Sequence, residues 1–292
     1  MNYKSLRLNY ENHGYCIVRG VFSEDKVSEL RNELLNCDLS ELSDKTSITW
    51  ADLPEVELSK NLISKIFFCQ ELTSCHEKIF FADNSEILPP LELMKNYLPH
   101  SLRASWHRDC DGELAYEFCK DRLHSEDYLF GKIGIFLQSN GPYGGAIDII
   151  PSSNYGIKKK SRVLFLLTQS VAALFNHYPR ASKLVSWIFK RRLKVNPGDV
   201  VFFDSRSLHR GSPAFRKIEK TLNYSNTTYQ ASLPQGHTKV VLYAHFGNAI
   251  GKESYLYDRS RRPNSSDLQL FEIFDHQNKH HKSNKRPLVK EQ

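Results

Sequence analysis

The second half of the sequence is a series of short strand patterns, each bounded by glycine, proline or polar residues. Residues 132–138, KIGIFLQ, place Ile133, Ile135 and Leu137 at alternate positions, as expected of a strand with one face in a core. Further runs rich in β-branched and aromatic residues follow at 144–151, 198–204, 221–229 and 239–246. Strands at such short intervals favour a sandwich or jelly-roll barrel over alternating strands and helices.

The first half predicts a strand and helices that flank this β-region. Residues 13–22, HGYCIVRGVF, alternate as a half-buried strand. Ser23 then has the position of an N-cap, and Val27, Leu30 and Leu34 recur behind it at helical spacing. Residues 55–82 are expected to be helical too. The fold class is therefore mainly β with flanking helices: one domain over residues 1–275, followed by a polar, disordered tail at 276–292.

The net charge of +7 is concentrated in one segment of the chain. No acidic residue lies between Asp148 and Asp199, although ten basic residues do: Lys158, Lys159, Lys160, Arg162, Arg180, Lys183, Lys190, Arg191, Arg192 and Lys194. Apolar residues recur at helical spacing in the same window, at Val171, Leu174, Phe175 and Tyr178, and a second helical pattern runs over 181–194. We expect a basic helical insert at about residues 156–194.

Three interpretations of this insert stay open. Basic, aromatic-bearing helices are typical of a peripheral contact with an anionic membrane, which would bring a lipid-linked substrate to the protein. A soluble polyanion such as a coenzyme A thioester or a nucleotide is the second partner that the charge would suit. The third interpretation is a helical hairpin whose charges are solvated. Nucleic acid is not expected, because no recognisable binding module accompanies the basic residues.

The sequence also bears on the compartment. No segment approaches the roughly 18 consecutive apolar residues of a membrane span. The first residues lack the apolar region of a secretory signal. None of the six cysteines forms a C-x-x-C pair, which favours reduced thiols. These features predict a cytoplasmic protein, with peripheral attachment to the inner face of a membrane if the insert binds lipid.

A candidate metal site begins in the stretch ASWHRDCDGE, residues 104–113. Residues i and i+2 of a strand face the same side, so the imidazole of His107 and the carboxylate of Asp109 can converge on one ion. His209, which follows the strand pattern at 198–204, is the best third ligand among the twelve histidines. Two histidines and one carboxylate form the facial triad of non-haem Fe(II) sites, which leaves coordination positions open.

Neighbouring residues have weaker claims on the metal. Asp111 shares a face with Asp109 but lies a further step along the chain. Asp204 better fits a turn residue, or a hydrogen-bond partner for a histidine N–H. Trp106 is expected to pack rather than to react. Motifs for a zinc protease, a phosphate loop, a dinucleotide turn and a nucleophile elbow are all absent from the sequence.

Several motifs in a fixed order strengthen the metal hypothesis. They are WHRD from residue 106, GGAIDIIPSSN from 144 and VNPGDVVFFDSRSLHRGSP from 195, preceded by NHGYCIVRGVFSEDKVSELRNEL from 12. Together they resemble the phytanoyl-CoA dioxygenase family of Fe(II)/2-oxoglutarate-dependent oxygenases, over about residues 10–225. The resemblance implies a double-stranded β-helix (jelly-roll) core. It also implies iron held by His107, Asp109 and His209, with 2-oxoglutarate and O₂ as cosubstrates.

The residue that would bind the distal carboxylate of 2-oxoglutarate is less clear. The family uses a basic residue, usually arginine, after the second histidine, and the usual spacing falls on Lys220. Lysine offers a point charge instead of the bidentate fork of arginine, so Lys220 departs from the family pattern. Arg216 is the alternative anchor. Gln138, at the end of the strand pattern at 132–138, is a further candidate for lining the pocket.

The sequence thus predicts an Fe(II)/2-oxoglutarate-dependent dioxygenase that hydroxylates a C–H bond. Its substrate would be lipid-linked or an anionic small molecule, such as a lipopolysaccharide or glycolipid sugar. Two alternatives stay open: a non-catalytic jelly-roll binding protein, and a cupin-like metal enzyme that does not use 2-oxoglutarate.

Overall fold

The computed structural model describes most of the chain. The described residues are 1–36, 48–49, 65–95, 106–138, 147–177, 189–211, 240–261, 275–276 and 278–279, and for 35–36, 48–49, 89–95 and 176–177 the backbone alone. The expected strand at 221–229 lies outside these ranges. The tail and the domain boundary near residue 275 fall almost wholly outside them and stay predictions.

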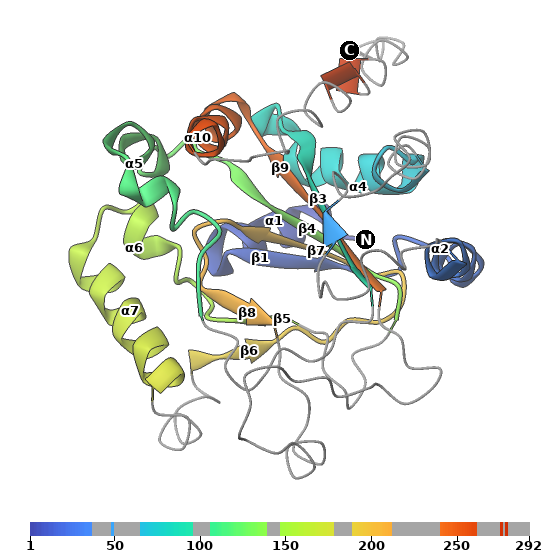
Figure 1. Cartoon of the computed structure of the whole chain (residues 1–292), viewed down its shortest axis with the longest axis horizontal. Coiled ribbons are helices and arrows are strands. Elements are labelled where there is room, and N and C mark those ends of the chain that lie inside the picture. Colours follow the sequence, from blue (N-terminus) through green and yellow to red (C-terminus); the bar gives the residue numbers. More distant parts are fainter. Residues whose placement is uncertain are drawn as a thin grey trace.

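A six-stranded antiparallel sheet forms one layer of the molecule (Figure 1). Its strands lie in the order β1-β7-β4-β9-β3-β2. Their bounds are β1 Tyr15–Val18, β2 Ile48–Thr49, β3 Glu86–Lys95, β4 Phe130–Phe136, β7 Val200–Asp204 and β9 Val240–Gly247. Neighbours in space are distant in sequence, so β4 pairs with both β7 and β9. This order places β4 in the middle of the sheet, hydrogen-bonded on both edges.

A smaller antiparallel sheet faces the first. It contains β6 Arg191–Arg192, β5 Ile147–Ile149 and β8 His209–Gly211, in that order. His107 extends it beyond β8 through an isolated antiparallel bridge to His209. Apolar side chains from both sheets form a shared buried cluster between the layers: Phe136, Ile147, Ile149, Leu193, Val195, Val201, Phe203, Val241 and Tyr243. Two such sheets closed over one core make the double-stranded β-helix that the motifs imply.

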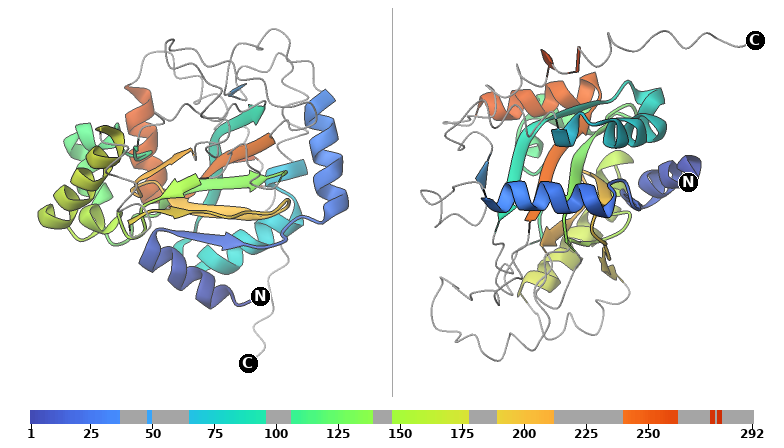
Figure 2. Two further views of the ribbon diagram at one scale, coloured as in Figure 1. Left: turned by 90° about the horizontal axis from the view of Figure 1, so that it is seen from below. Right: turned by 90° about the vertical axis from the view of Figure 1, so that its right-hand side faces the viewer.

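Helices cover the outer face of the large sheet (Figure 2). They are α1 Tyr3–His13, α2 Glu24–Asn36 and α4 Gln70–Phe80, the last followed by the 3₁₀ turn η3 Phe81–Asp83. The expected helix after Ser23 is confirmed, and its predicted core residues Val27, Leu30 and Leu34 are buried. A helix within 55–82 is confirmed over α4.

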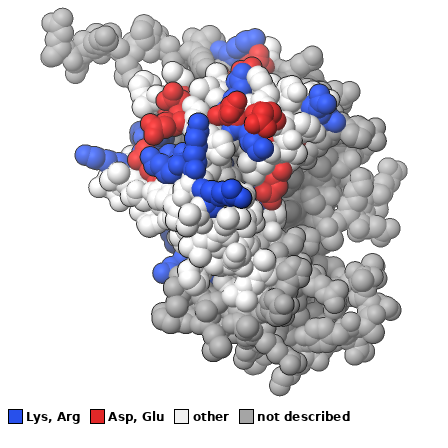
Figure 3. All heavy atoms as spheres, turned by 90° about the vertical axis from the view of Figure 1, so that its left-hand side faces the viewer, with Lys and Arg blue, Asp and Glu red and all other residues white. Residues whose placement is uncertain are grey.

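A second group of helices lies at the other end of the barrel: η4 Glu113–Ala115, α5 Glu117–Leu123, α6 Tyr155–Lys158, α7 Arg162–His177 and α10 Ala249–Ser260. The helical insert is confirmed in α6 and α7. The buried side of α7 packs Ala172 and Phe175 on Trp106. Its opposite side exposes Val163, Leu164, Leu166 and Leu167. Figure 3 views this end of the molecule, where basic side chains border a white, uncharged area. Within the ranges given above, no helix has the length and hydropathy of a membrane span.

The expected second helix of the insert, up to Lys194, is wrong at its C-terminal end. Arg191 and Arg192 form β6 and pair with β5, and Leu193 is buried in the core between the sheets. The reason is a distant partner: Nε of Arg192 donates to the buried carboxylate of Asp148, 3.0 Å away. Helical periodicity cannot reveal such a contact, because it depends only on residues that are close in sequence.

Candidate metal centre

His107, Asp109 and His209 lie together, as the sequence predicts. One ligand atom from each residue falls within 4.8 Å of the others, and no further group of three potential ligands occurs in the described part of the chain. Nε2 of His209 is 3.7 Å from Oδ1 of Asp109, and the two histidine ring centres are 4.5 Å apart. The spacing suits three ligands on one side of a metal ion.

Backbone pairing fixes the two histidines side by side. The amide of His107 donates to the carbonyl of His209 at 3.1 Å, and the amide of His209 donates back at 3.0 Å. Residues directly opposite in such a pair project their side chains on the same face. The edge of the small sheet therefore sets the relation between two ligands from distant parts of the chain.

Successive side chains of residues 106–109 point in alternate directions, toward helix α7 and toward the candidate metal site. Trp106 is buried, with its ring 5.5 Å from that of Phe175 on α7. The guanidinium of Arg108 donates to Thr168 of the same helix, at 3.2 Å. His107 and Asp109, at the intervening positions, lie on the metal side. The packing role predicted for Trp106 is confirmed.

His209 is held in the form that binds a metal. Its Nδ1 lies 3.0 Å from the carbonyl oxygen of Ser207, which can only accept, so Nδ1 carries the proton. The lone pair is then on Nε2, the atom nearest Asp109. Burial lowers the pKa of His209 to about 4, against the attraction of Asp109. The imidazole is therefore neutral at pH 7, as a metal ligand must be.

Asp109 is the candidate anionic ligand. Burial opposes its ionisation, but the charge of Lys132, with contributions from His209 and His107, holds the pKa of the carboxyl well below its usual range. Its Oδ2 is buried and has no hydrogen-bond partner among the residues described. This buried carboxylate oxygen accepts no hydrogen bond from the described residues and lies beside two imidazoles. The arrangement fits a bound divalent metal ion.

Lys132 is a site residue that the sequence reasoning missed. It lies on β4, and its Nζ is 3.4 Å from Oδ1 of Asp109. A signal was available: Ile133 and Ile135 place one face of KIGIFLQ in the core, which puts Lys132 on the opposite face. In a sandwich, that face of a central strand also points into the interior.

Of the three predicted cosubstrate residues, the structure describes only Gln138. Arg216 and Lys220 lie outside the described residues. Oε1 of Gln138 accepts from the amide of Val240 at 2.6 Å and from Arg31 at 3.3 Å, so it joins β9 to α2. Six residues of strand, roughly 20 Å, separate it from Lys132. A pocket role for Gln138 stays a prediction, and the observed contacts favour a structural one.

The two carboxylates with weaker claims have other partners. Oδ2 of Asp111 accepts from the amide of Arg108 at 2.9 Å, which closes the turn after His107. Asp204 forms a turn, as expected, but the idea that it partners a histidine is wrong. Its carboxylate accepts from the side chains of Arg206 and, at 3.2 Å, Asn154.

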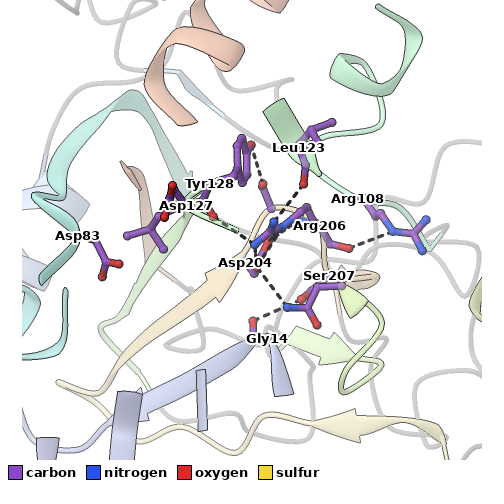
Figure 4. A network of polar contacts seen from close by, with 12 residues as sticks. Gly14, Asp83, Arg108, Leu123, Asp127, Tyr128, Asp204, Arg206 and Ser207 are labelled. Carbon is purple, nitrogen blue, oxygen red and sulfur yellow. Dashed lines mark hydrogen bonds and ion pairs between the residues drawn. The ribbon is translucent and has the colours of Figure 1, made fainter. Parts of the chain in front are cut away.

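The ion pair of Asp204 and Arg206 braces the loop that leads to His209 (Figure 4). Both side chains are buried, and the shortest N–O distance is 2.7 Å. The guanidinium also donates to the carbonyls of Leu123 and Tyr128, at 3.1 and 3.4 Å. The carbonyl of Arg206 accepts from Arg108, at 3.0 Å. One arginine thus connects the segments on which His107 and His209 lie.

Replacing a candidate ligand should weaken metal binding strongly. We expect Asp109→Asn and His209→Ala to weaken Co(II) affinity more than about 100-fold, since replacing a residue that only hydrogen-bonds to a metal ligand already changes affinity 10- to 100-fold. Cobalt absorption and calorimetric titration measure this. Asp111→Asn is the matched control, because it keeps an oxygen acceptor two residues away. Equal losses in both aspartate variants would contradict the assignment.

Removing the arginine of the brace should destabilise the fold. Arg206→Met leaves Asp204 buried without its cation, which costs about 3–5 kcal/mol of unfolding free energy. Urea unfolding of the metal-free protein measures this loss. Arg122→Met provides the comparison: its pair with Glu253 spans 2.5 Å but lies at the surface, where about 1 kcal/mol or less is expected. Similar losses in the two variants would refute the role of Arg206.

Solved structures with a similar fold share little sequence with this chain. The crystal structure of EvdMO1 gives a TM-score of 0.51 at 13% identity, covering 85% of this chain and 50% of that one. The non-heme alpha ketoglutarate dependent epimerase SnoN from nogalamycin biosynthesis gives 0.49 at 13% identity, with 85% and 83% covered. HygX from Streptomyces hygroscopicus, solved with nickel and 2-oxoglutarate bound, gives 0.49 at 10% identity, with 84% and 87% covered.

No protein-family model and no curated protein sequence matches the chain. The similarity to EvdMO1 concerns the fold alone, and it agrees with the two facing sheets. The resemblance to the phytanoyl-CoA dioxygenase family stays a prediction.

Proposed function

We propose that this chain is an Fe(II)/2-oxoglutarate-dependent oxygenase that hydroxylates a C–H bond of a small molecule. One observation carries the proposal: the facial set of His107, Asp109 and His209 at the edge of a double-stranded β-helix. Iron with bound 2-oxoglutarate and O₂ supplies the oxidising power for such a reaction.

The chain's own residues have defined tasks in this proposal. The backbone pair of His107 and His209 would hold two imidazoles toward a bound ion, and Asp109 would supply the third ligand. Iron bound by these three residues would keep coordination positions open for the cosubstrate and O₂. His107 is exposed whereas His209 is buried, so solvent reaches the site from the His107 side. A substrate carbon is expected to approach from there.

The two alternative functions predict different behaviour of the same residues. A cupin-like metal enzyme would bind iron but would not bind 2-oxoglutarate. A non-catalytic jelly-roll protein would not need the metal-ready tautomer of His209 or the ionised Asp109. The neutral, buried imidazole of His209 beside Asp109 and His107 supports a metal-binding role, which the metal-enzyme alternatives require.

The exposed face of α7 supports a peripheral membrane contact. Leu166 and Leu167 are 52% and 54% exposed, and Val163 lies one turn away on the same face. Lys159, Lys160 and Arg162 are exposed at the N-terminal end of the helix. Apolar residues bordered by basic ones suit an anionic bilayer, to which each cation near the surface contributes about 1 kcal/mol. This favours a lipid-linked substrate, such as a lipopolysaccharide or glycolipid sugar, at the inner face of a membrane.

Cosubstrate binding can be tested without a substrate. Anaerobic titration of 2-oxoglutarate into the Fe(II)-loaded protein should give a saturable charge-transfer absorption band. His209→Ala and the double variant His107→Ala, Asp109→Ala should give none. Iron binding without a band would favour the cupin-like enzyme. No iron binding by the wild-type protein would favour the non-catalytic protein.

Membrane contact can be tested by sedimentation with vesicles that contain anionic phosphatidylglycerol. We expect the wild-type protein to bind. The double variant Leu166→Asp, Leu167→Asp should bind at least about tenfold more weakly, because each leucine side chain that enters the bilayer contributes about 1.5–3 kcal/mol to the binding free energy. Leu8→Asp is the matched control, since Leu8 is 48% exposed on α1. Failure of the wild-type protein to sediment would leave a soluble anionic substrate as the better interpretation.

A further inference from the structure

Glu113 carries a buried carboxyl group that the candidate metal centre does not use. It lies in η4, four residues after Asp109, and is 1% exposed. Its Oε2 lies 2.6 Å from Oγ of Ser254 on α10 and 3.4 Å from the hydroxyl oxygen of Tyr128, which precedes β4. Its Oε1 is buried and accepts no hydrogen bond from the described residues. The carboxyl group thus joins three segments of the fold.

A chain of contacts connects this carboxyl group to both ligand segments. The hydroxyl oxygen of Tyr128 is 3.3 Å from Oγ of Ser205, which lies in the loop that leads to His209. The carbonyl of Ser205 accepts from the amide of Cys110, at 3.3 Å. Cys110 directly follows Asp109. A change at the carboxyl group therefore acts on the backbone beside two of the candidate ligands.

The surroundings of Glu113 do not favour a negative charge. The titratable groups that face it are Asp258 of α10, Cys119 of α5, Tyr128, Cys110 and Asp109. No cation of the described residues forms a salt bridge with Glu113. Arg206 lies on the far side of Tyr128, 4.8 Å from its ring centre, and is paired with Asp204. Ionised, Glu113 would be a buried carboxylate without a cation, which is costly.

A proton on Glu113 removes this cost and fits the contacts. Burial raises the pKa of Glu113 to about 7, with contributions from the carboxyl groups of Asp258 and Asp109. The hydrogen bonds from Ser254 and Tyr128 act in the opposite direction. A hydroxyl group can accept as well as donate, so the contacts of Oε2 are also satisfied when that oxygen carries a proton.

Metal binding changes the charge that Glu113 faces. When Asp109 coordinates a divalent cation, the carboxylate that disfavours ionisation of Glu113 is offset, and positive charge is added beside it. The added charge is the same whatever else pairs with Asp109. A nearby positive charge favours the ionised form of a carboxyl group. The proton affinity of Glu113 is therefore lower in the metal-loaded protein than in the metal-free one.

From this geometry we propose that Glu113 is a positioning residue that holds a proton in the metal-free protein and releases it to solvent when a divalent cation binds at the candidate metal centre. The inference rests on the proposed function for its metal ion. The neutral acid keeps η4 packed on α10 and Tyr128 while the site is empty. Because metal and proton oppose each other, metal affinity rises with pH over the range in which Glu113 titrates.

Calorimetry measures the released proton. Co(II) is titrated into the metal-free protein at about pH 6.5 in two buffers of different ionisation enthalpy, and the difference in heat gives the number of protons released per metal ion. Glu113→Gln should release roughly 0.3–0.5 proton fewer than the wild-type protein, since a group with a pKa of about 7 is mostly protonated at that pH. Glu117→Gln is the matched control: Glu117 is exposed on α5 and pairs with Lys120, so its variant should release as many protons as the wild-type protein.

Urea unfolding of the metal-free protein provides a second measurement. An acid whose pKa is raised on folding makes the unfolding free energy fall as the pH rises from about 4.5 to about 7. Glutamine resembles the neutral acid, so the urea midpoint of Glu113→Gln should exceed that of the wild-type protein by roughly 0.5–1 M more at about pH 7.5 than at about pH 5. If the glutamine variant does not fold, Ser254→Ala replaces it. Loss of the hydrogen bond that lowers the pKa of Glu113 should then move the pH dependence of both measurements to higher pH.

The outcomes separate this inference from the proposed function. Equal proton release by the wild-type protein and Glu113→Gln overturns the inference and leaves the oxygenase proposal standing. A glutamine variant that loses equal stability at about pH 5 and about pH 7.5 overturns it as well, because Glu113 would then have a structural role that does not depend on its proton. If the wild-type protein does not bind Co(II), the proposed function fails, and the inference fails with it.

Discussion

The antiparallel pair of His107 and His209 is the contact on which the site depends. Its two hydrogen bonds join segments far apart in sequence: the neighbouring contact of Arg108 with Arg206 spans 98 residues. Closing so long a loop costs entropy before any contact compensates for it. The pair therefore needs support from its surroundings, and the chain provides it in the residues on either side of each histidine.

That support comes from buried charged side chains that pair with groups elsewhere in the fold. Arg206 donates to Asp204 and to the carbonyls of Leu123 and Tyr128, and it accepts from Arg108 through its own carbonyl. A comparable group lies under the small sheet, where the buried carboxylate of Asp148 is within 3.5 Å of cations on Lys190, Arg192 and Arg210. Such groups add little net stability over apolar packing. They do specify which strands meet, because a slipped register would bury a charge without its partner.

The sequence was informative where the relevant pattern is local. Alternation separates His107 and Asp109 from Trp106 and Arg108, and the structure places the two sets on opposite sides of one segment. The strands at 198–204 and 239–246 likewise follow from their own residues.

Other elements escaped prediction because their cause lies elsewhere in the fold. In α1, Tyr10 is buried and Tyr3 and Leu6 pack partly buried against the same core, so the stripe holds only one aliphatic residue and is a weak signal in a polar helix. The sequence around Arg191 and Arg192 fits a helical pattern, but the two residues form a strand beside β5, where Arg192 pairs with Asp148. Lys132 is inconspicuous in its strand, since a lysine at an alternate position usually faces water. Only the second sheet turns that face into an interior.

Helix α7 of the insert packs directly against the segment that carries His107 and Asp109. Phe165, Thr168 and Phe175 of α7 contact Arg108 and Trp106, the residues interleaved with His107 and Asp109. The helix thus holds the back of the ligand segment with one face, while Leu166 and Leu167 on its other face are exposed. A surface bound by those leucines would lie one helix diameter, about 10 Å, from the segment that carries the candidate ligands His107 and Asp109. No hinge is needed to relate the two sites, because a single helix forms the wall between them.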